Sequence, residues 1–99
     1  MYLLKSKDVD SDIFDGELIL MNLETRQVLV LNEAAKILWS AIDILNTRDG
    51  LLDLLREAMP NMNSSQLETS LDEILGTLLT GGFLRAESEI AVYAAQLDP

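Results

Sequence analysis

The sequence predicts an α+β domain, with an antiparallel sheet in the first third of the chain and a helical bundle after it. The chain from Leu3 to Leu31 contains short runs of leucine, isoleucine and valine, which are typical of strands. Beyond Asn32 the apolar residues recur at intervals of three and four, which is the period of an amphipathic helix. With 99 residues, the chain is long enough for one domain with a modest core.

Two strands are clearly predicted in this first part. They are ELILMN at residues 17–22 and QVLVLN at residues 27–32, and the short LETR segment between them suits a hairpin loop. The segment YLLKSKDV at residues 2–9 is a weaker first strand. Because residues 18–21 are all apolar, the strand that contains them is apolar on both faces, and we expect something to cover each side.

The acidic segment DVDSDIFDG at residues 8–16 has aspartates at the opening spacing of a calcium-binding EF-hand loop. That loop needs a glycine at its sixth position and a glutamate at its twelfth, where this chain has Ile13 and Ile19. We therefore interpret the segment as a solvated acidic linker that ends in a turn at Asp15-Gly16.

Three helices are predicted from their start and stop signals. Asn32 is a good N-cap for a first helix that reaches the neighbourhood of Asn46. Thr47 caps a second helix, which Pro60 ends near Met59. The third helix follows the capping-box pattern NSSQ at residues 63–66 and ends at the glycine pair GG. Its buried stripe is expected to be Leu67, Leu71, Ile74 and Leu78, with Phe83 and Leu84 packing back after the glycines.

We expect one domain over residues 1–84 and a C-terminal extension over residues 85–99. The extension contains SEIAVYAAQLDP, in which apolar residues share one helical face and predict a short fourth helix. These apolar residues are Ile90, Tyr93, Ala94 and Leu97.

Composition excludes several function classes. The chain has no cysteine and no histidine, so disulfides, zinc sites and catalysis by Ser–His or Cys–His pairs are not expected. Seventeen acidic and seven basic residues give a net charge of −10, which repels phosphate backbones and anionic membranes and favours a basic or neutral partner. No apolar segment has the length of a membrane span or of a signal peptide, so we expect a cytoplasmic protein.

Two further classes can be tested against the residues. An acyl carrier protein is also small, acidic and helical, but neither DSD at residues 10–12 nor Ser64 and Ser65 have the neighbours of its modified serine. A winged-helix DNA-binding regulator would combine the last two helices with the hairpin, yet no basic residue occurs between Glu57 and Leu84. DNA binding is therefore kept only as the alternative function.

Several features follow one another in a defined order from Leu3 to Leu84. They are the apolar strand after Asp15-Gly16, the Leu31-Asn32 pair that opens a helix containing Trp39, Thr47 at the second cap, and Leu78 with GGFL. In this order and spacing the chain resembles the PqqD family, the leader-peptide recognition elements of ribosomally made, post-translationally modified peptides. The resemblance implies a three-stranded antiparallel sheet followed by a three-helix, winged-helix-like bundle.

The resemblance also implies a binding site. In such domains the leader peptide of a precursor adds as a strand to the edge of the third strand and lies in a groove against the third helix. At the matching positions, the edge is residues 27–31 and the groove wall lies within residues 67–79. We expect acidic residues of this wall to receive a basic leader side chain and leucines to receive an apolar one. The expected peptide-binding residues are Gln27, Val28, Leu29, Val30, Leu31, Glu68, Leu71, Asp72, Leu75 and Leu79.

The function implied by the resemblance is that of a non-catalytic module that delivers a precursor to a separate modifying enzyme. Such enzymes include radical SAM enzymes, cyclodehydratases and lasso-peptide proteases. We expect no catalytic residue, cofactor, metal, nucleic acid or membrane to take part. In the competing interpretation, the C-terminal extension or a second copy of the protein, in a homodimer, covers the strand edge.

The extension provides a first prediction. If its apolar stripe packs on its own domain or on a neighbouring copy, deleting residues 88–99 will lower the thermal midpoint or change the oligomeric state. Thermal denaturation and sedimentation of the truncated and full-length chains measure both quantities. An unchanged midpoint together with an unchanged mass would show that the extension is a free arm.

Overall fold

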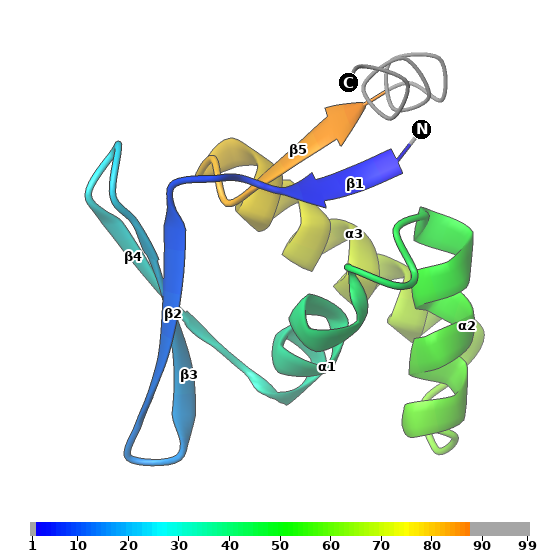
Figure 1. The fold of residues 1–99 in the computed structure, drawn as a ribbon. Helices are drawn as coiled ribbons and strands as arrows, with labels where there is room; N and C mark the ends of the chain where they lie inside the picture. Colours follow the sequence, from blue (N-terminus) through cyan, green and yellow to red (C-terminus); the bar gives the residue numbers. More distant parts are fainter. Residues whose placement is uncertain (1, 88–99) are drawn as a thin grey trace.

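The computed structural model describes residues 2–87, which form two small sheets and three helices (Figure 1). The bundle of helices lies on one side of the molecule and the larger sheet on the other. The elements are β1 (Tyr2–Lys5), β2 (Val9–Phe14), β3 (Glu17–Asn22), β4 (Gln27–Leu31), α1 (Glu33–Ala41), α2 (Arg48–Ala58), α3 (Ser64–Thr80) and β5 (Leu84–Glu87). Within residues 2–87, no helix has the length and apolar character needed to cross a membrane.

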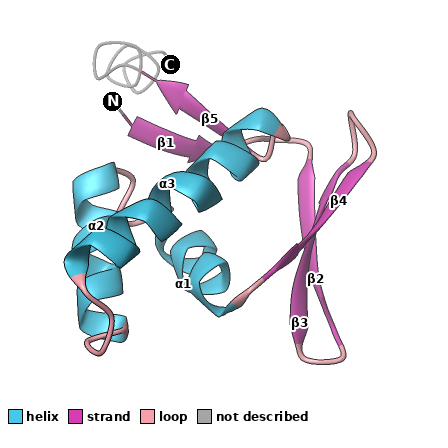
Figure 2. Cartoon of the chain, turned by 180° about the vertical axis from the view of Figure 1, so that it is seen from behind, coloured by secondary structure: helices cyan, strands magenta, loops and turns pink. Residues whose placement is uncertain are grey.

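The larger sheet is antiparallel, with the strand order β2-β3-β4, so β4 is one of its edges. A second sheet pairs β1 with β5, and Figure 2 shows this pair above the helices and apart from the larger sheet. The α+β class and the three-stranded antiparallel sheet ahead of three helices are therefore confirmed. The β1–β5 pair is an addition that the sequence did not predict.

The first strand of the larger sheet differs from the one expected. The acidic segment is not a linker, because residues 9–14 form β2 and pair along their whole length with β3. The turn at Asp15-Gly16 is confirmed, and its two residues have φ of 54° and 80°, the left-handed conformation that a tight hairpin turn requires. The acidic side chains are compatible with a strand because Asp10 and Asp12 are exposed on an edge strand.

The weaker strand near the N-terminus does form, but with another partner. Tyr2 pairs with Glu87 and Lys5 with Leu84, so β1 lies antiparallel to β5. Residues 85–87, which were expected to begin the C-terminal extension, are therefore part of a strand. The helix expected over residues 88–99 lies outside the described residues.

The three predicted helix caps are confirmed by hydrogen bonds. The side-chain oxygen of Asn32 accepts from the amide of Ala35 at 2.9 Å, and that of Asn63 accepts from Gln66 at 2.8 Å. Thr47 Oγ1 accepts from the amide of the glycine three residues later at 3.2 Å. Each bond satisfies one of the amides that a helix start leaves without an intrahelical partner. The first helix ends at Ala41, before the point that the sequence predicted.

The core lies between the helices and the inner faces of the two sheets. Leu20 from β3 is fully buried against it, and Leu3 and Leu84 close it from the side of β1 and β5. The outer face of the larger sheet is different, because Val28 is 64% exposed and Val30 is 51% exposed. No described element covers this outer face, contrary to the expectation that both faces are covered.

One buried polar side chain connects the larger sheet to the helices. Asn22, at the end of β3, is 4% exposed, and its Nδ2 donates to the carbonyl oxygens of Gly81 at 3.0 Å and Gly82 at 3.1 Å. Its Oδ1 accepts from the amides of Glu24 at 3.1 Å and Thr25 at 3.2 Å. Asn22 therefore fixes the β3–β4 loop and the end of α3 at the same time.

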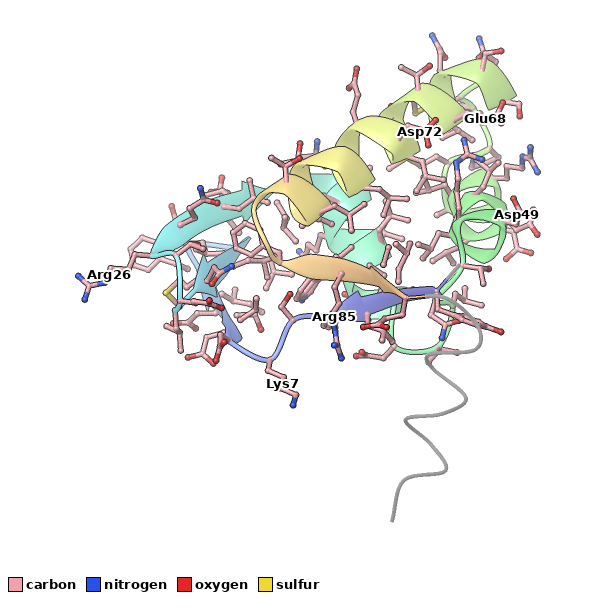
Figure 3. The ribbon with its side chains drawn as sticks, turned by 90° about the horizontal axis from the view of Figure 1, so that it is seen from above. Lys7, Arg26, Asp49, Glu68, Asp72 and Arg85 are labelled. Carbon is pink, nitrogen blue, oxygen red and sulfur yellow. The ribbon has the colours of Figure 1, made fainter. Side chains whose placement is uncertain are left out.

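A second connection joins α2 to α3 at the surface. Arg48 Nε donates to Asp72 Oδ1 at 2.8 Å, and a second guanidinium nitrogen donates to Oδ2 at 3.0 Å. Glu68 lies 3.8 Å from the same guanidinium group, and Figure 3 shows Glu68 and Asp72 together on α3. The hydrogen bond from Arg48 holds the pKa of Asp72 below its ordinary value.

Asn22 gives a prediction about stability. Replacing Asn22 by alanine removes the donor from two carbonyl groups and the acceptor from two amides, so we expect a loss of about 2 to 3 kcal/mol in the free energy of unfolding. Urea denaturation measures this loss. Asn61→Ala, at an exposed asparagine in the turn before α3, is the matched control and should change little. Equal midpoints for the two variants would contradict the role of Asn22.

The Arg48–Asp72 pair gives a prediction about pH. Because the pKa of Asp72 is lowered in the folded state, the pair contributes stability above the ordinary aspartate pKa of about 3.9 and loses it as the pH falls through the lowered value. Arg48→Met should therefore be less stable than the wild type at neutral pH and equally stable at strongly acidic pH.

Carboxyl titration by NMR checks the cause directly. The pKa of Asp72 should return toward its ordinary value in Arg48→Met and stay low in Arg56→Met, whose arginine pairs with Asp53 on its own helix. An Asp72 pKa that is the same in the wild type and in Arg48→Met would refute the assignment.

Candidate peptide-binding site

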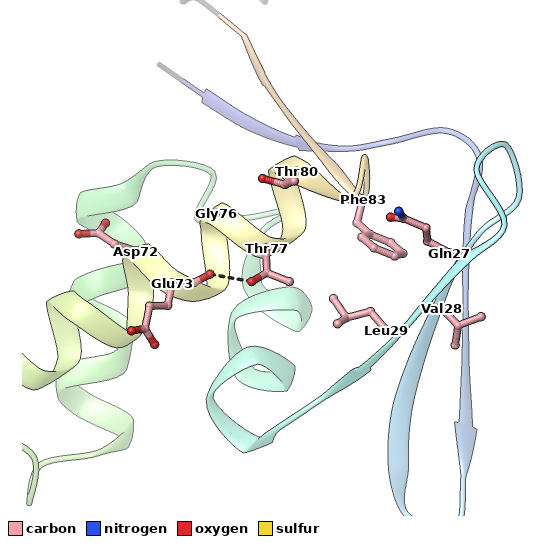
Figure 4. Close-up of a pocket in the computed structure, with 10 residues that line it drawn as sticks. Gln27, Val28, Leu29, Asp72, Glu73, Gly76, Thr77, Thr80 and Phe83 are labelled. Atoms are coloured by element: carbon pink, nitrogen blue, oxygen red, sulfur yellow. Dashed lines mark hydrogen bonds between the residues drawn. The ribbon is translucent and has the colours of Figure 1, made fainter.

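A groove lies between the open edge of the larger sheet and α3. Its wider part has a volume of about 880 Å³ and its narrower part about 220 Å³, and the two share Leu29, Glu73 and Thr77 in their walls. We call the two parts together the β4–α3 groove. The wider part is drawn in Figure 4.

One wall of the groove is β4. Alternation along the strand sends Leu29 and Leu31 toward the helices, where Leu29 is half-buried and Leu31 is buried. Val28 and Val30 belong to the opposite face, and Figure 4 shows Leu29 directed toward the helices and Val28 directed away from them. The backbone of β4 therefore forms the rim of the groove, with apolar side chains below it.

The other wall is one face of α3. Glu73, Thr77 and Thr80 recur at intervals of four and three and are exposed on this face, and Ile74 lies half-buried beside them. Thr77 Oγ1 donates to the carbonyl oxygen of Glu73 at 3.0 Å (Figure 4). Gly76 adds no side chain to this wall, and a Cβ atom there would have no neighbour within 4 Å.

The end of the groove is formed by the turn after α3. Phe83 is 2% exposed, and its ring would lie only 2.6 Å from a Cβ atom added to Gly81. A larger residue than glycine would therefore displace the ring. Gly82 has φ of 74°, which favours glycine, and its carbonyl oxygen accepts from Asn22. The turn, the ring and the asparagine together fix how far β4 lies from the end of α3.

The charges in the groove are acidic. The charged residues among its lining are Asp72 and Glu73, and the lining contains no lysine or arginine. Asp72 is paired with Arg48, whereas Glu73 has no ion-pair partner within residues 2–87. The same part of the chain holds no cluster of three side chains that could bind a metal ion.

The structure brings together only some of the residues that the sequence indicated. All five residues of β4, from Gln27 to Leu31, line the groove, and so does Asp72. Leu71 is fully buried in the core, and Glu68 lies beside Arg48. Leu75 and Leu79 line a different depression of about 600 Å³, together with Leu3 and the start of α2.

The orientation of α3 is therefore corrected. The face expected beside β4 contained Glu68, Asp72, Leu75 and Leu79. Asp72 lines the groove, but Leu75 is 6% exposed and packs in the core, and Leu79 lines the other depression. The groove face instead contains Glu73, Ile74 and Thr77. Helix α3 packs against both α2 and β5. From the sequence alone, either the apolar stripe that includes Ile74 or the one that includes Leu75 could therefore have been the buried one.

Sequence reasoning missed the groove residues Ile74, Gly76 and Thr77 and the supporting Asn22. Ile74 was assigned to the core because it continues a leucine repeat. Gly76 offered a signal, since a glycine inside a helix lowers the stability of the helix by about 1 kcal/mol relative to alanine. A glycine at such a position can indicate that another backbone approaches closely. Asn22 offered none for its link to α3, because the two carbonyl groups to which it donates lie 59 and 60 residues away along the chain.

Comparison with known proteins connects this geometry to a family. The structure of TbiB1 in complex with the TbiA(beta) leader peptide has the same fold, with a TM-score of 0.74 and 20% sequence identity over 87% of this chain and 99% of that chain. No curated protein matches the chain. The family model of coenzyme PQQ synthesis protein D (PqqD) matches residues 17–84, which is more than half of the chain and includes both walls of the groove. The chain belongs to the PqqD family.

Proposed function

We propose that this protein is a non-catalytic leader-peptide-binding module, which captures a ribosomal precursor peptide and presents it to a separate modifying enzyme. The observation that carries the proposal is the open edge of β4 beside the β4–α3 groove. Membership of the PqqD family and the fold shared with TbiB1, which was solved with a leader peptide, support it.

The edge of β4 can bind an extended peptide by adding a strand. Its backbone groups on the open side have no strand partner within residues 2–87. A peptide that pairs with them forms main-chain hydrogen bonds whatever its sequence, as in other cases of β-augmentation. Binding of this kind also removes the hazard that an open edge poses for aggregation.

The side chains that line the groove then select among peptides by their side chains. In an added strand, alternate side chains point to the same face as Leu29 and Leu31 and enter the groove. There they meet Ile74 and the buried Leu78 in the narrower part and Phe83 in the wider part. A leader with apolar side chains two residues apart fits this wall. The intervening side chains lie beside Val28 and Val30 on the outer face.

The partners follow from this role. We propose that the second partner is a modifying enzyme, of the radical SAM, cyclodehydratase or lasso-peptide protease class, which carries out the chemistry on the peptide held here. The alternative of a DNA-binding regulator has little support in the structure. Helix α3, which would have to approach phosphates, carries three acidic residues and no basic one.

A pair of matched variants tests the groove. Thr77→Phe places a ring in the shared part of the groove, and we expect at least tenfold weaker binding of a fluorescent peptide that carries the leader of the precursor encoded beside this gene. The matched control is Thr69→Phe, because both threonines are exposed on α3 and donate to the carbonyl four residues earlier. Thr69 does not line the groove, so this control should bind like the wild type.

The binding mode is checked with the same leader carrying one N-methyl group at a time on its backbone amides. Strand addition predicts that binding is lost at alternate positions only, since every second amide points toward β4. Loss of binding in Thr69→Phe but not in Thr77→Phe, or an N-methyl scan without a period of two, would contradict the proposed function.

A further inference from the structure

We propose that Glu73 selects a basic side chain in the leader peptide, at a position that faces the groove. The inference rests on the proposed function and specifies one property of the ligand. Glu73 belongs to the walls of both parts of the groove, as do Leu29 on β4 and Thr77 on α3, so it lies where the two parts meet. Its carboxylate is directed away from Leu29 in Figure 4, so the side chain that pairs with it has to be long enough to extend across this face of α3, as lysine and arginine are.

Within residues 2–87, the ion pairs leave Glu73 as the charged residue of the groove lining that has no partner. The neighbouring Asp72 is held by two hydrogen bonds from Arg48, at 2.8 and 3.0 Å, on the side of α3 that faces α2. Figure 4 shows the carboxylates of both Asp72 and Glu73 directed away from β4, so the ion pair with Arg48 is what distinguishes Asp72 from Glu73. Since the groove lining contains no lysine or arginine, a cation that pairs with Glu73 must come from the bound peptide.

The surroundings of Glu73 favour an ion pair at this one position over a general attraction to the acidic surface. Ile74 and Leu29 line the same part of the groove as Glu73, and a bound peptide would cover them and exclude part of the water around the carboxylate. A charge pair that is partly shielded from water is stronger than an open one. The net charge of −10 also attracts basic peptides, but that attraction acts from every side and is screened by salt.

The size of the effect can be estimated. An ion pair at a partly exposed site changes affinity by about fivefold or less, which is enough to rank peptides but not to create binding alone. The main-chain bonds of β4 and the apolar wall must supply the rest. Glu73 is therefore a specificity residue, and leaders with a lysine or arginine at the matching position are expected to bind in preference to those with an acid there.

Selection from a displayed library of randomised twelve-residue peptides tests this inference. The wild type should enrich peptides with apolar residues two positions apart and a lysine or arginine at one fixed place in that pattern. Glu73→Lys should enrich aspartate or glutamate at the same place, and Glu73→Gln should show no charge preference there. Glu57→Lys and Glu57→Gln, at an exposed glutamate of α2, change the net charge equally and should keep the wild-type pattern.

The outcomes separate this inference from the proposed function. A basic preference that survives Glu73→Lys, or one that Glu57→Lys also reverses, would overturn the role of Glu73 and leave the peptide-binding role intact. The same holds if the wild type enriches apolar peptides without a basic position. Enrichment of the same peptides by the groove-blocked Thr77→Phe, or of none by the wild type, would overturn the proposed function itself.

Discussion

The hydrogen bonds from the Asn22 side chain to Gly81 and Gly82 tie the larger sheet to the turn at the end of α3. The sheet and α3 also share the apolar core, because Leu20 and Leu31 are buried in the same cluster as the leucines of α3. Asn32 follows β4 directly and caps α1, so the far end of β4 is joined to the helical bundle. The β4–α3 groove lies between these two connections.

Local signals in the sequence were sufficient for the parts of the fold that depend on neighbouring residues. The caps at Asn32, Thr47 and Asn63 and the turn at Asp15-Gly16 involve partners within a few residues, so their residue types identify them. The edge strand at residues 27–31 was also predicted, with help from the family resemblance.

The predictions that were wrong concern features that depend on contacts between segments far apart in the sequence. Nothing in the acidic residues 8–16 shows that they pair with β3, and nothing near Tyr2 shows that its partner is Glu87. The face of α3 was misjudged for the same reason, since Ile74 and Leu75 are both apolar and the packing of α2 and β5 against α3 decides which one is buried.

The direct junction between β4 and α1 has a consequence for distance. The junction holds β4 in place relative to α1, so under the proposed function the side-chain pockets of the β4–α3 groove set the register of a peptide that pairs with it. Under the proposed function, the number of residues between the bound segment and the remainder of the precursor then limits how far a reactive residue extends from the domain. The length of this connecting segment would therefore decide which residue of the precursor a modifying enzyme can reach.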